Sequence, residues 1–384
     1  MNLSVTHQSQ PVQDAVTVVR AATPRLVDAF IELPYAIYAQ DPHWVPPLRR
    51  DERRRLDTRR NAFFEHAAIE LWIAFTGGEP CGRIAAIEDR AHNEFHRERM
   101  AWFGFFEAID ASTARALLGA AEDWARARGC PAMRGPVNPS LNESAGLLVQ
   151  GFDDDPCLLM PYNPPEYPGF IEGAGYTKVK DLLAWRMDPA VPLGPRIERL
   201  AARLRRRGDV RVRRVDMKRF DRDLAAMNAI YRSAWEHNWG FVPPTDAEMN
   251  QLATDLKPAI DPDLVLFVDI DERPVGCGVC LPDLNQVLKR MNGRLLPFGL
   301  WHFLNRRSIV NRVRVVLLGV VAECRHIGVY PLLIFELHRN ARANGYKAAE
   351  LSWTLEDNDE VNAGIIAAGG TLDKKYRIYE KALG

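Results

Sequence analysis

The sequence predicts an α/β protein with mixed sheets, built from two similar domains in tandem. Its 384 residues exceed one average domain and are enough for two. Strand-like and helix-like segments alternate along the chain, and the second half repeats the pattern of the first. The composition, 47% hydrophobic and 26% charged, is that of an ordinary globular protein.

Each half contains two strands joined by a tight turn. In the first half, LWIAFTGGEPCGRIAAIED reads as a hairpin around a Gly-Gly turn, and LVLFVDIDERPVGCGVCLPD repeats it in the second half. Pro80 and Gly82 correspond to Pro274 and Gly276, an offset of 194 residues. A match in both order and punctuation favours two copies of one fold over two unrelated domains.

The later segments repeat as well. Each half has an amphipathic helix with arginines in its last turn, one closed by Gly129 and the other by Gly345. Strands follow (AMRGPV and AAELSWTL), and then a glycine before the final strand, Gly175 and Gly369, again 194 residues apart. We expect each half to be a hairpin, strand, helix, strand, helix and strand.

A proline-rich joint, MDPAVPLGP, separates the halves. It predicts an N-terminal domain over residues 1–188 and a C-terminal domain over 189–384.

Bulk properties exclude several classes of protein. The formal net charge is zero, which argues against a protein that binds nucleic acid through bulk charge. The N-terminal residues lack the apolar stretch of a signal peptide, and no run of about 18 apolar residues occurs. The six cysteines are scattered, which suits a reducing compartment. We therefore expect a cytoplasmic protein.

No metal site is expected. Cys277 and Cys280 form a C-x-x-C motif, but residues three apart on a strand point to opposite faces. His92 and His96 could share a helical face, yet no third ligand is evident, so a solvated surface helix is the preferred interpretation.

One turn of the second half has the features of an anion site. The apolar strand VRVVLLGVV is followed by AECRHIGVY and by a helix that should begin at about Pro331. Backbone N–H groups at a helix N-terminus bind phosphate, Gly328 permits close approach, and Arg325 adds charge. The first half has only Asp110-Ala-Ser-Thr there, so we expect one such site.

This turn resembles the pyrophosphate loop of the GNAT superfamily of acyltransferases, with Val320, Arg325 and Gly328 at the matching positions. The resemblance implies two tandem GNAT-like domains, the first a degenerate copy, and coenzyme A or long-chain acyl-CoA as co-substrate. The residues it assigns to that ligand are Leu318, Val320, Arg325, His326, Gly328, Val329, Tyr330, Asn358 and Asn362. Two positions depart from the family pattern: Tyr330 is bulky, and Ile365 replaces the usual tyrosine acid.

A basic amphipathic segment, about residues 284–314, interrupts the second half. It has no acidic residue, and aromatic and leucine side chains alternate with seven cationic ones: Lys289, Arg290, Arg294, Arg306, Arg307, Arg312 and Arg314. Two interpretations stay open. The segment lies on an anionic membrane surface, making the protein peripheral on the inner face of the cytoplasmic membrane. Alternatively, it is a lid over the core, with its arginines on the outer face or binding the phosphates of coenzyme A.

The tandem arrangement, together with NAFFEHA, RGPVNPSLNESAGLL and AWEHNWGFVPP, resembles a bacterial family of double-GNAT proteins that includes the ceramide synthases. The resemblance implies transfer of a fatty acyl group from acyl-CoA to the amine of a sphingoid base, 3-ketosphinganine or sphinganine. Two alternatives stay open: an acetyltransferase of a small soluble amine, and a non-catalytic acyl-CoA-binding protein. Acyl length, acceptor and oligomeric state are not determined.

Acyl transfer needs a base for the ammonium group and donors for the oxyanion, here strand N–H groups near Val320. His237 and Glu236 are the base candidates, because His237 has a suitable ordinary pKa and both follow the acceptor-binding helix. Tyr376, Glu143 and Tyr162 are further candidates. The residues predicted to contact the substrate are Trp235, Trp239, Phe241, Phe298, Trp301, Tyr162 and Glu143.

Overall fold

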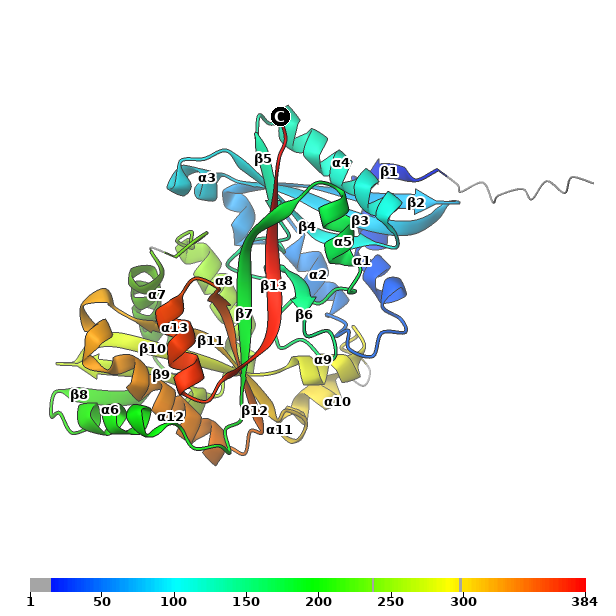
Figure 1. Ribbon diagram of the computed structural model, residues 1–384. Helices are drawn as coiled ribbons and strands as arrows, with labels where there is room; N and C mark the ends of the chain where they lie inside the picture. The colour runs from blue at the N-terminus through cyan, green and yellow to red at the C-terminus, as the bar shows by residue number, and fades with distance from the viewer. Residues whose placement is uncertain (1–14, 237, 297–298) are drawn as a thin grey trace, which may run out of the picture.

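The computed structural model describes residues 15–236, 238–296 and 299–384 of the chain. Figure 1 shows two lobes, the upper formed mostly by the first half of the chain and the lower mostly by the second. Two long strands, β7 and β13, run side by side through both lobes (Figure 1).

The first half supplies strands and helices in the predicted alternation. The strands are β1 (Thr17–Arg20), β2 (Ala67–Thr76), β3 (Glu79–Asp89), β4 (Met100–Ala108), β5 (Ala132–Gly135), β6 (Leu147–Gln150) and β7 (Thr177–Met187). The helices are α1 (Pro24–Ile37), α2 (Arg49–Arg55), the 3-10 helix η1 (Ala62–Glu65), α3 (Arg90–His96), α4 (Ala111–Ala127) and α5 (Tyr167–Gly173).

The second half follows the same order with additional helices. Its strands are β8 (Val210–Arg214), β9 (Val265–Ile270), β10 (Arg273–Pro282), β11 (Arg312–Val320), β12 (Ala348–Leu355) and β13 (Thr371–Ala382). Its helices are α6 (Pro195–Arg205), α7 (Phe220–Trp235), α8 (Asp246–Leu256), η2 (Lys257–Ala259), η3 (Pro262–Leu264), α9 (Asn285–Met291), α10 (Gly299–Leu304), α11 (Arg306–Ile309), η4 (Ala322–Ile327), α12 (Val329–Ala343) and α13 (Asp359–Ala367).

The two predicted hairpins are β2–β3 and β9–β10, and both are antiparallel. A tight hairpin turn that matches the twist of its strands requires positive φ at its central residues. Gly77 and Gly78 provide φ of 59° and 87° in the first turn, and Asp271 and Glu272 provide 48° and 65° in the second. The two halves therefore repeat a backbone geometry with different residues.

The glycines at the repeat offset let a helix pack closely on a strand. A Cβ on Gly82 would lie 2.5 Å from Thr113 and 2.7 Å from Leu117 of α4. A Cβ on Gly276 would lie 2.6 Å from Val329 of α12. Neither distance is possible for real atoms, so both positions need glycine. The equivalent contacts agree with the prediction of two copies of one fold.

The last strand of each half is exchanged. The strands form one sheet in the order β1-β2-β3-β4-β5-β13-β7-β12-β11-β10-β9-β8, and β6 pairs with β13. Strand β13 lies between β5 and β7, while β7 lies between β13 and β12, so each half completes the strands of the other. Residues 188–194 connect β7 to α6. A domain boundary at residue 188 stays a prediction. Across that boundary, β7 pairs with β12 of the second half, and β13 pairs with β5 of the first half.

The core of each lobe contains residues from the exchanged strand. Tyr376 and Ile378 of β13 are buried among first-half residues such as Phe30. Trp185 and Met187 of β7 are buried in the cluster of the second half. The hydrophobic energy of either lobe therefore depends on both halves of the chain.

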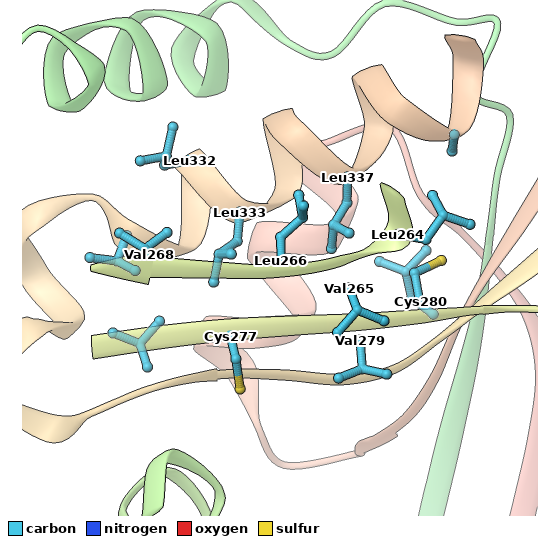
Figure 2. Packing of buried hydrophobic residues seen from close by; sticks show 14 of the residues in the cluster. Leu264, Val265, Leu266, Val268, Cys277, Val279, Cys280, Leu332, Leu333 and Leu337 are labelled. Atoms are coloured by element: carbon cyan, nitrogen blue, oxygen red, sulfur yellow. The ribbon is translucent and has the colours of Figure 1, made fainter. Parts of the chain in front are cut away.

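In the lower lobe, leucines of α12 pack on β9 (Figure 2). Leu332, Leu333 and Leu337 are buried against Leu266 and Val268. Full burial of one such side chain stabilises the fold by about 1.5–3 kcal/mol.

The two cysteines of β10 do not form a pair. Figure 2 shows Cys277 and Cys280 on opposite faces of β10, as the strand assignment predicted, and both are buried. Burial raises the pKa of both thiols.

The basic segment folds as three short helices, α9, α10 and α11. Val287 and Met291 of α9 pack with Leu48 of the first half. Apolar side chains are exposed on α10 and at Leu296, which precedes it: Leu296 (67% exposed), Leu300 (43%), Trp301 (62%) and Leu304 (67%). Within the described ranges, no helix is long and apolar enough to cross a membrane.

Three of the seven cationic side chains in this segment face the protein. Arg314 is buried and donates to Ser352 Oγ and the Leu158 carbonyl. Arg312 pairs with Asp283 at 2.8 Å, and Lys289 pairs with Asp155. Arg312 and Lys289 are thus paired with carboxylates, whereas the partners of Arg314 are a hydroxyl group and carbonyl groups. A role of the segment in binding lipid or phosphate stays a prediction.

Candidate active site

Strands β11 and β12 run parallel and then separate. They pair only over 312–315 and 348–351, although both continue beyond these residues. The pairing of β11 with β10 skips Val316, and such a bulge increases local twist and bends the strand. A cleft opens between the two strands, and Val316 and Leu318 line it.

In the first half the equivalent gap is filled by the chain itself. The Val137 amide donates to the Phe103 carbonyl at 2.9 Å, and the Asn138 side chain accepts the Phe105 N–H at 2.6 Å. Gly104 has no space for a side chain, since a Cβ would lie 1.6 Å from the Val137 carbonyl oxygen. The segment after β5 therefore occupies the position that stays open beside β11.

Gly328 starts α12. Its φ of 100° lies in the left-handed region, where side chains with a Cβ are strained. The helix begins at Val329, two residues before the predicted start, so Pro331 lies in the first turn, where a missing N–H breaks no helical bond. Among the described residues, no side chain caps the helix, and both Gly328 and Tyr330 line the cavity. Uncapped first-turn amides at the positive end of a helix suit an anion.

Arg325 has a partner that the sequence did not indicate. Its Nη2 donates to the carbonyls of Ser233 (3.4 Å) and Ala234 (3.1 Å), in the last turn of α7. These bonds tie the loop before α12 to α7. Further positive charge on the cavity wall comes from α6 and the residues after it: Arg196, Arg203 and Arg207.

Six of the nine residues assigned to the co-substrate line the cavity: Leu318, Arg325, His326, Gly328, Tyr330 and Asn358. The other three, Val320, Val329 and Asn362, are buried and do not line it. That the six bind acyl-CoA stays a prediction.

Asn362 has a structural role. Its side chain accepts the Thr354 hydroxyl at 2.7 Å and donates to the Leu355 carbonyl at 2.9 Å, which holds the end of β12. These bonds commit its side-chain amide to the strand, and a contact of Asn362 with the ligand stays a prediction. Asn358 caps α13 by accepting the Val361 N–H.

Burial raises the pKa of Tyr330, while Arg325 and the Val320 amide act in the opposite direction. The phenol is therefore neutral at physiological pH. Its side chain is part of the wall and not an exposed obstruction at the helix start.

The cavity continues from the cleft into the first half and has a volume of about 2100 Å³. Sites for drug-sized ligands occupy about 300–1,000 Å³, so this cavity has room for more than one such molecule. Five residues predicted to contact substrate line it: Trp235, Trp239, Phe241, Tyr162 and Glu143. Trp235 lies directly on β11, since a Cβ on Gly319 would lie 2.5 Å from its ring.

The remaining candidates lie elsewhere. His237 and Phe298 fall outside the described residues. Glu236 is the C-cap residue directly after α7, is exposed and does not line the cavity. Tyr376 is fully buried in the core of the first lobe, because β13 is exchanged, and Trp301 is exposed on α10. The structure thus brings neither Tyr376 nor Trp301 to the cavity. The position of Tyr376 depends on the strand order, which the sequence does not show.

A histidine joins the two lobes beside the cavity. His66 Nδ1 lies 2.9 Å from Asp89, and its Nε2 lies 3.2 Å from Glu248 of α8. The hydrogen bond to Asp89 and the nearby Glu248 carboxylate raise the pKa of His66 to about 9, against the effect of burial. Glu248 lines the cavity. Because the pKa of His66 lies above neutral pH, Glu248 is paired there with a cationic imidazole.

The other paired histidines form no metal site. His92 is buried, and its Nε2 lies 2.7 Å from Glu98, so the predicted solvated position is wrong for this residue. No cluster of three or more histidine, cysteine, aspartate or glutamate residues suited to a metal ion occurs in the described part of the chain.

Comparison with known proteins gives two full-length relatives. No family model matches the chain. It is 38% identical to the "Bacterial ceramide synthase" of Caulobacter vibrioides over 379 residues, covering 96% of this chain and 98% of that protein. The chain belongs to the bacterial ceramide synthase family. It is also 35% identical to "Protein YghO" of Escherichia coli, covering 92% of each chain.

Solved structures similar to this member of the bacterial ceramide synthase family are tandem GNAT proteins. One is a tandem GNAT protein from the clavulanic acid biosynthesis pathway, with a TM-score of 0.56, 12% identity and coverage of 96% of this chain and 99% of that one. Another is a GCN5-related N-acetyltransferase from Sphaerobacter thermophilus, with a TM-score of 0.55, 12% identity and 96% coverage of both chains. These similarities establish the tandem GNAT fold predicted from the sequence.

Sequence reasoning missed several lining residues of this family member. Neither the arginines of α6 nor Glu248 of α8 were among the site residues predicted from the sequence. The capping box of Thr245 and Glu248 was a readable signal for the start of α8. Its contact with His66 was not readable, since the two residues are separated by 182 positions.

Proposed function

We propose that the protein is an acyl-CoA-dependent N-acyltransferase that moves a fatty acyl group to the amine of a sphingoid base, 3-ketosphinganine or sphinganine, giving a ceramide-type amide. The observation that carries this proposal is a cavity of about 2100 Å³, which is lined both by the α12 N-terminus and by a group of carboxylates from the first half and α8. Similarity to a bacterial ceramide synthase over nearly the whole chain supports it.

The residues around the cleft suit coenzyme A. Pyrophosphate would lie at the first turn of α12, where Gly328 leaves the backbone open and no side chain competes for the amides. His326 and the arginines of α6 would face the remaining phosphate groups. When bound, the co-substrate supplies a thioester carbonyl as acyl donor and a thiolate as leaving group.

The rest of the wall suits aliphatic chains. Leu158, Leu159 and Met160 line the cavity together with Leu288 of α9 and Leu48. Each buried methylene of a chain contributes about 0.8 kcal/mol to binding. The presence of Leu288 and Leu48 also brings the cavity to the base of the basic segment.

Product analysis tests the function directly. Purified protein, palmitoyl-CoA and sphinganine or 3-ketosphinganine are incubated together, and the amide is sought by mass spectrometry. We expect an N-palmitoyl product and stoichiometric release of coenzyme A. Acetyl transfer to a small soluble amine, without any long-chain amide, would contradict the proposal. Binding of acyl-CoA without turnover on any amine would favour the non-catalytic alternative.

We further propose that α10 brings the enzyme to an anionic membrane surface. Leu296, Leu300, Trp301 and Leu304 are exposed there. Four cationic side chains of the segment form no ion pair within the described residues: Arg290, Arg294, Arg306 and Arg307. Apolar side chains with free cations around them fit an anionic bilayer, which also holds long-chain amines.

Flotation measures this interaction. We expect the protein to float with phosphatidylglycerol vesicles and not with phosphatidylcholine vesicles, and high salt to release it. Trp301→Glu should abolish flotation, whereas Ile109→Glu, which changes an apolar residue 56% exposed in the first half, should leave it intact. Equal flotation of Trp301→Glu and wild type would rule out α10 as the contact.

A further inference from the structure

Carboxylates gather at the end of the cavity formed by the first half. The lining includes Asp51, Glu52, Glu143, Glu248 and Asp255. Arg54 and Arg55 belong to the same part of the lining, while Arg325 and His326 line the cavity beside the start of α12. An acidic, partly buried site suits an alkylammonium group.

Glu143 is the least neutralised carboxylate of this group. Glu52 pairs with Arg55 at 2.9 Å, and Asp255 pairs with Arg54 at 2.7 Å. Glu248 pairs with His66, and Asp51 with Arg50 at 3.3 Å. The ion pair of Glu143 in the described residues is with Arg55 Nε at 3.9 Å, too long for a hydrogen bond.

The loop that carries Glu143 is held in place at both ends. The Asn138 amide donates to the Ser144 carbonyl at 2.7 Å, and the Gly146 amide donates to the Pro136 carbonyl at 3.0 Å. Glu143 therefore follows directly from the segment that closes the gap in the first half. In the first half, the segment that fills the gap beside β4 thus continues into the loop that carries Glu143.

The neighbour of Glu143 ties this loop to the other half. Asn142 accepts the Tyr231 hydroxyl at 3.2 Å and donates to the Val242 carbonyl at 3.1 Å. Tyr231 belongs to α7, whose last residue, Trp235, lies on β11. A chain of direct contacts thus connects Glu143 to the strand that borders the cleft.

Electrostatics match this position to proton transfer. Burial raises the pKa of Glu143 to about 7, Arg55 acts to lower it, and Glu248, Glu52 and Asp255 act to raise it. A general base is most effective when its pKa lies near the working pH. The exposed Glu236 has no such surroundings.

We propose that the carboxylates around Glu143 form the site of the acceptor's ammonium group, and that Glu143 is the general base. The inference rests on the proposed acyl transfer and adds that the first half supplies the base and, together with α8, the acceptor site. The chemical class of the ligand is a long-chain primary amine, which enters with its ammonium group toward Glu143 and its chain along the apolar wall.

The step balances as follows. The ammonium group gives one proton to the Glu143 carboxylate, which releases it to solvent. The nitrogen lone pair then forms the C–N bond with the thioester carbonyl carbon. The tetrahedral centre collapses as the C–S bond breaks, and the sulfur leaves with its electron pair. The second proton lost by nitrogen ends on that sulfur, so one amide, one thiol and one free proton result.

The test compares Glu143→Gln and Glu143→Asp with Glu166→Gln, an exposed carboxylate of the first half outside the cavity. We expect Glu143→Gln to lower kcat by about 10²–10⁴-fold and to remove the rise of wild-type kcat/KM with pH near 7. Binding of palmitoyl-CoA, measured by calorimetry, should change by less than about twofold, since the anion site is untouched. Glu143→Asp should restore part of the rate, and Glu166→Gln should equal wild type.

Two outcomes would overturn the inference. One is a Glu143→Gln enzyme that keeps more than about a third of wild-type kcat with the same pH profile. The other concerns a wild type that makes no amide, which would end the proposed function. In that case sphinganine binding, followed through the fluorescence of Trp235 and Trp239, decides the ammonium site. Equal affinity of wild type and Glu143→Gln would then reject it.

Discussion

At the scale of single residues, Gly328 shapes the turn at which we propose that the second half binds an anion. It is the only residue type that adopts a φ of 100° without strain, and its hydrogen leaves the first turn of α12 open. In the first half, Asp110 takes the corresponding position and accepts the Thr113 N–H at 2.7 Å, which lowers the pKa of its carboxyl group. A carboxylate there satisfies the helix and repels a phosphate.

Gly328→Ala tests this role. An added Cβ would meet no atom within 4 Å, so the cost is conformational, about 1–2 kcal/mol. We expect weaker coenzyme A binding, by about five- to thirtyfold, in isothermal titration calorimetry. Gly119→Ala, at an open helical position in α4, is the matched control and should be neutral or stabilising. Unchanged affinity in Gly328→Ala would show that the ligand does not depend on this turn.

At the scale of elements, the loop after β5 and helix α8 connect the halves around the cavity. His66 lies just after η1, Asp89 at the end of β3 and Glu248 in α8, so one imidazole holds three elements together. Because the folded pKa of about 9 exceeds the ordinary value of 6.5, charged His66 stabilises the folded state. This contribution is fully present below pH 6.5 and is lost as pH rises through 9.

His66→Gln should therefore destabilise the protein more at pH 6 than at pH 9.5. At about 1.4 kcal/mol per pKa unit, the difference amounts to at most roughly 3 kcal/mol. Urea unfolding at the two pH values measures it. His96→Gln, whose ring nitrogen lies 2.9 Å from the Phe241 carbonyl, is the control. A loss of stability in His66→Gln that does not vary with pH would indicate packing without a charge effect.

At the scale of the whole molecule, exchange of the final strands makes the two halves interdependent. Strand β13 lies between β5 and β7 and buries Tyr376 and Ile378 in the first lobe. In return, β7 pairs with β12 and buries Trp185 in the second lobe. An uncovered edge and missing core residues would destabilise either half alone.

Separate expression of residues 1–188 and 189–384 tests this interdependence. We expect each fragment alone to lack a cooperative thermal transition and to aggregate. Its final strand would lack the strands of the other half with which it pairs, and this leaves an exposed sheet edge. Co-expression should yield a soluble complex that unfolds in one transition. Cooperative unfolding of either fragment by itself would contradict the expected dependence.

Local sequence features were sufficient for the elements and for one end of the site. Turn residues, helix ends and strand alternation depend on neighbours in the chain, so the hairpins, the Gly328 turn and the Asp110 cap were predictable. The repeated glycines Gly82 and Gly276 indicated two copies of one fold, and the motifs around the Gly328 turn indicated the superfamily.

Tertiary structure decided where the elements lie and which side chains meet. The sequence alone could not show that β7 and β13 exchange places, because either arrangement satisfies the same local pattern. The exchange buries Tyr376 in the core of the first lobe. Nor could the sequence distinguish the exposed Glu236 from Glu143, whose pKa depends on four residues distant in the chain. Proton affinity is set by burial and by charges close in space, and these exist only once both halves have folded together.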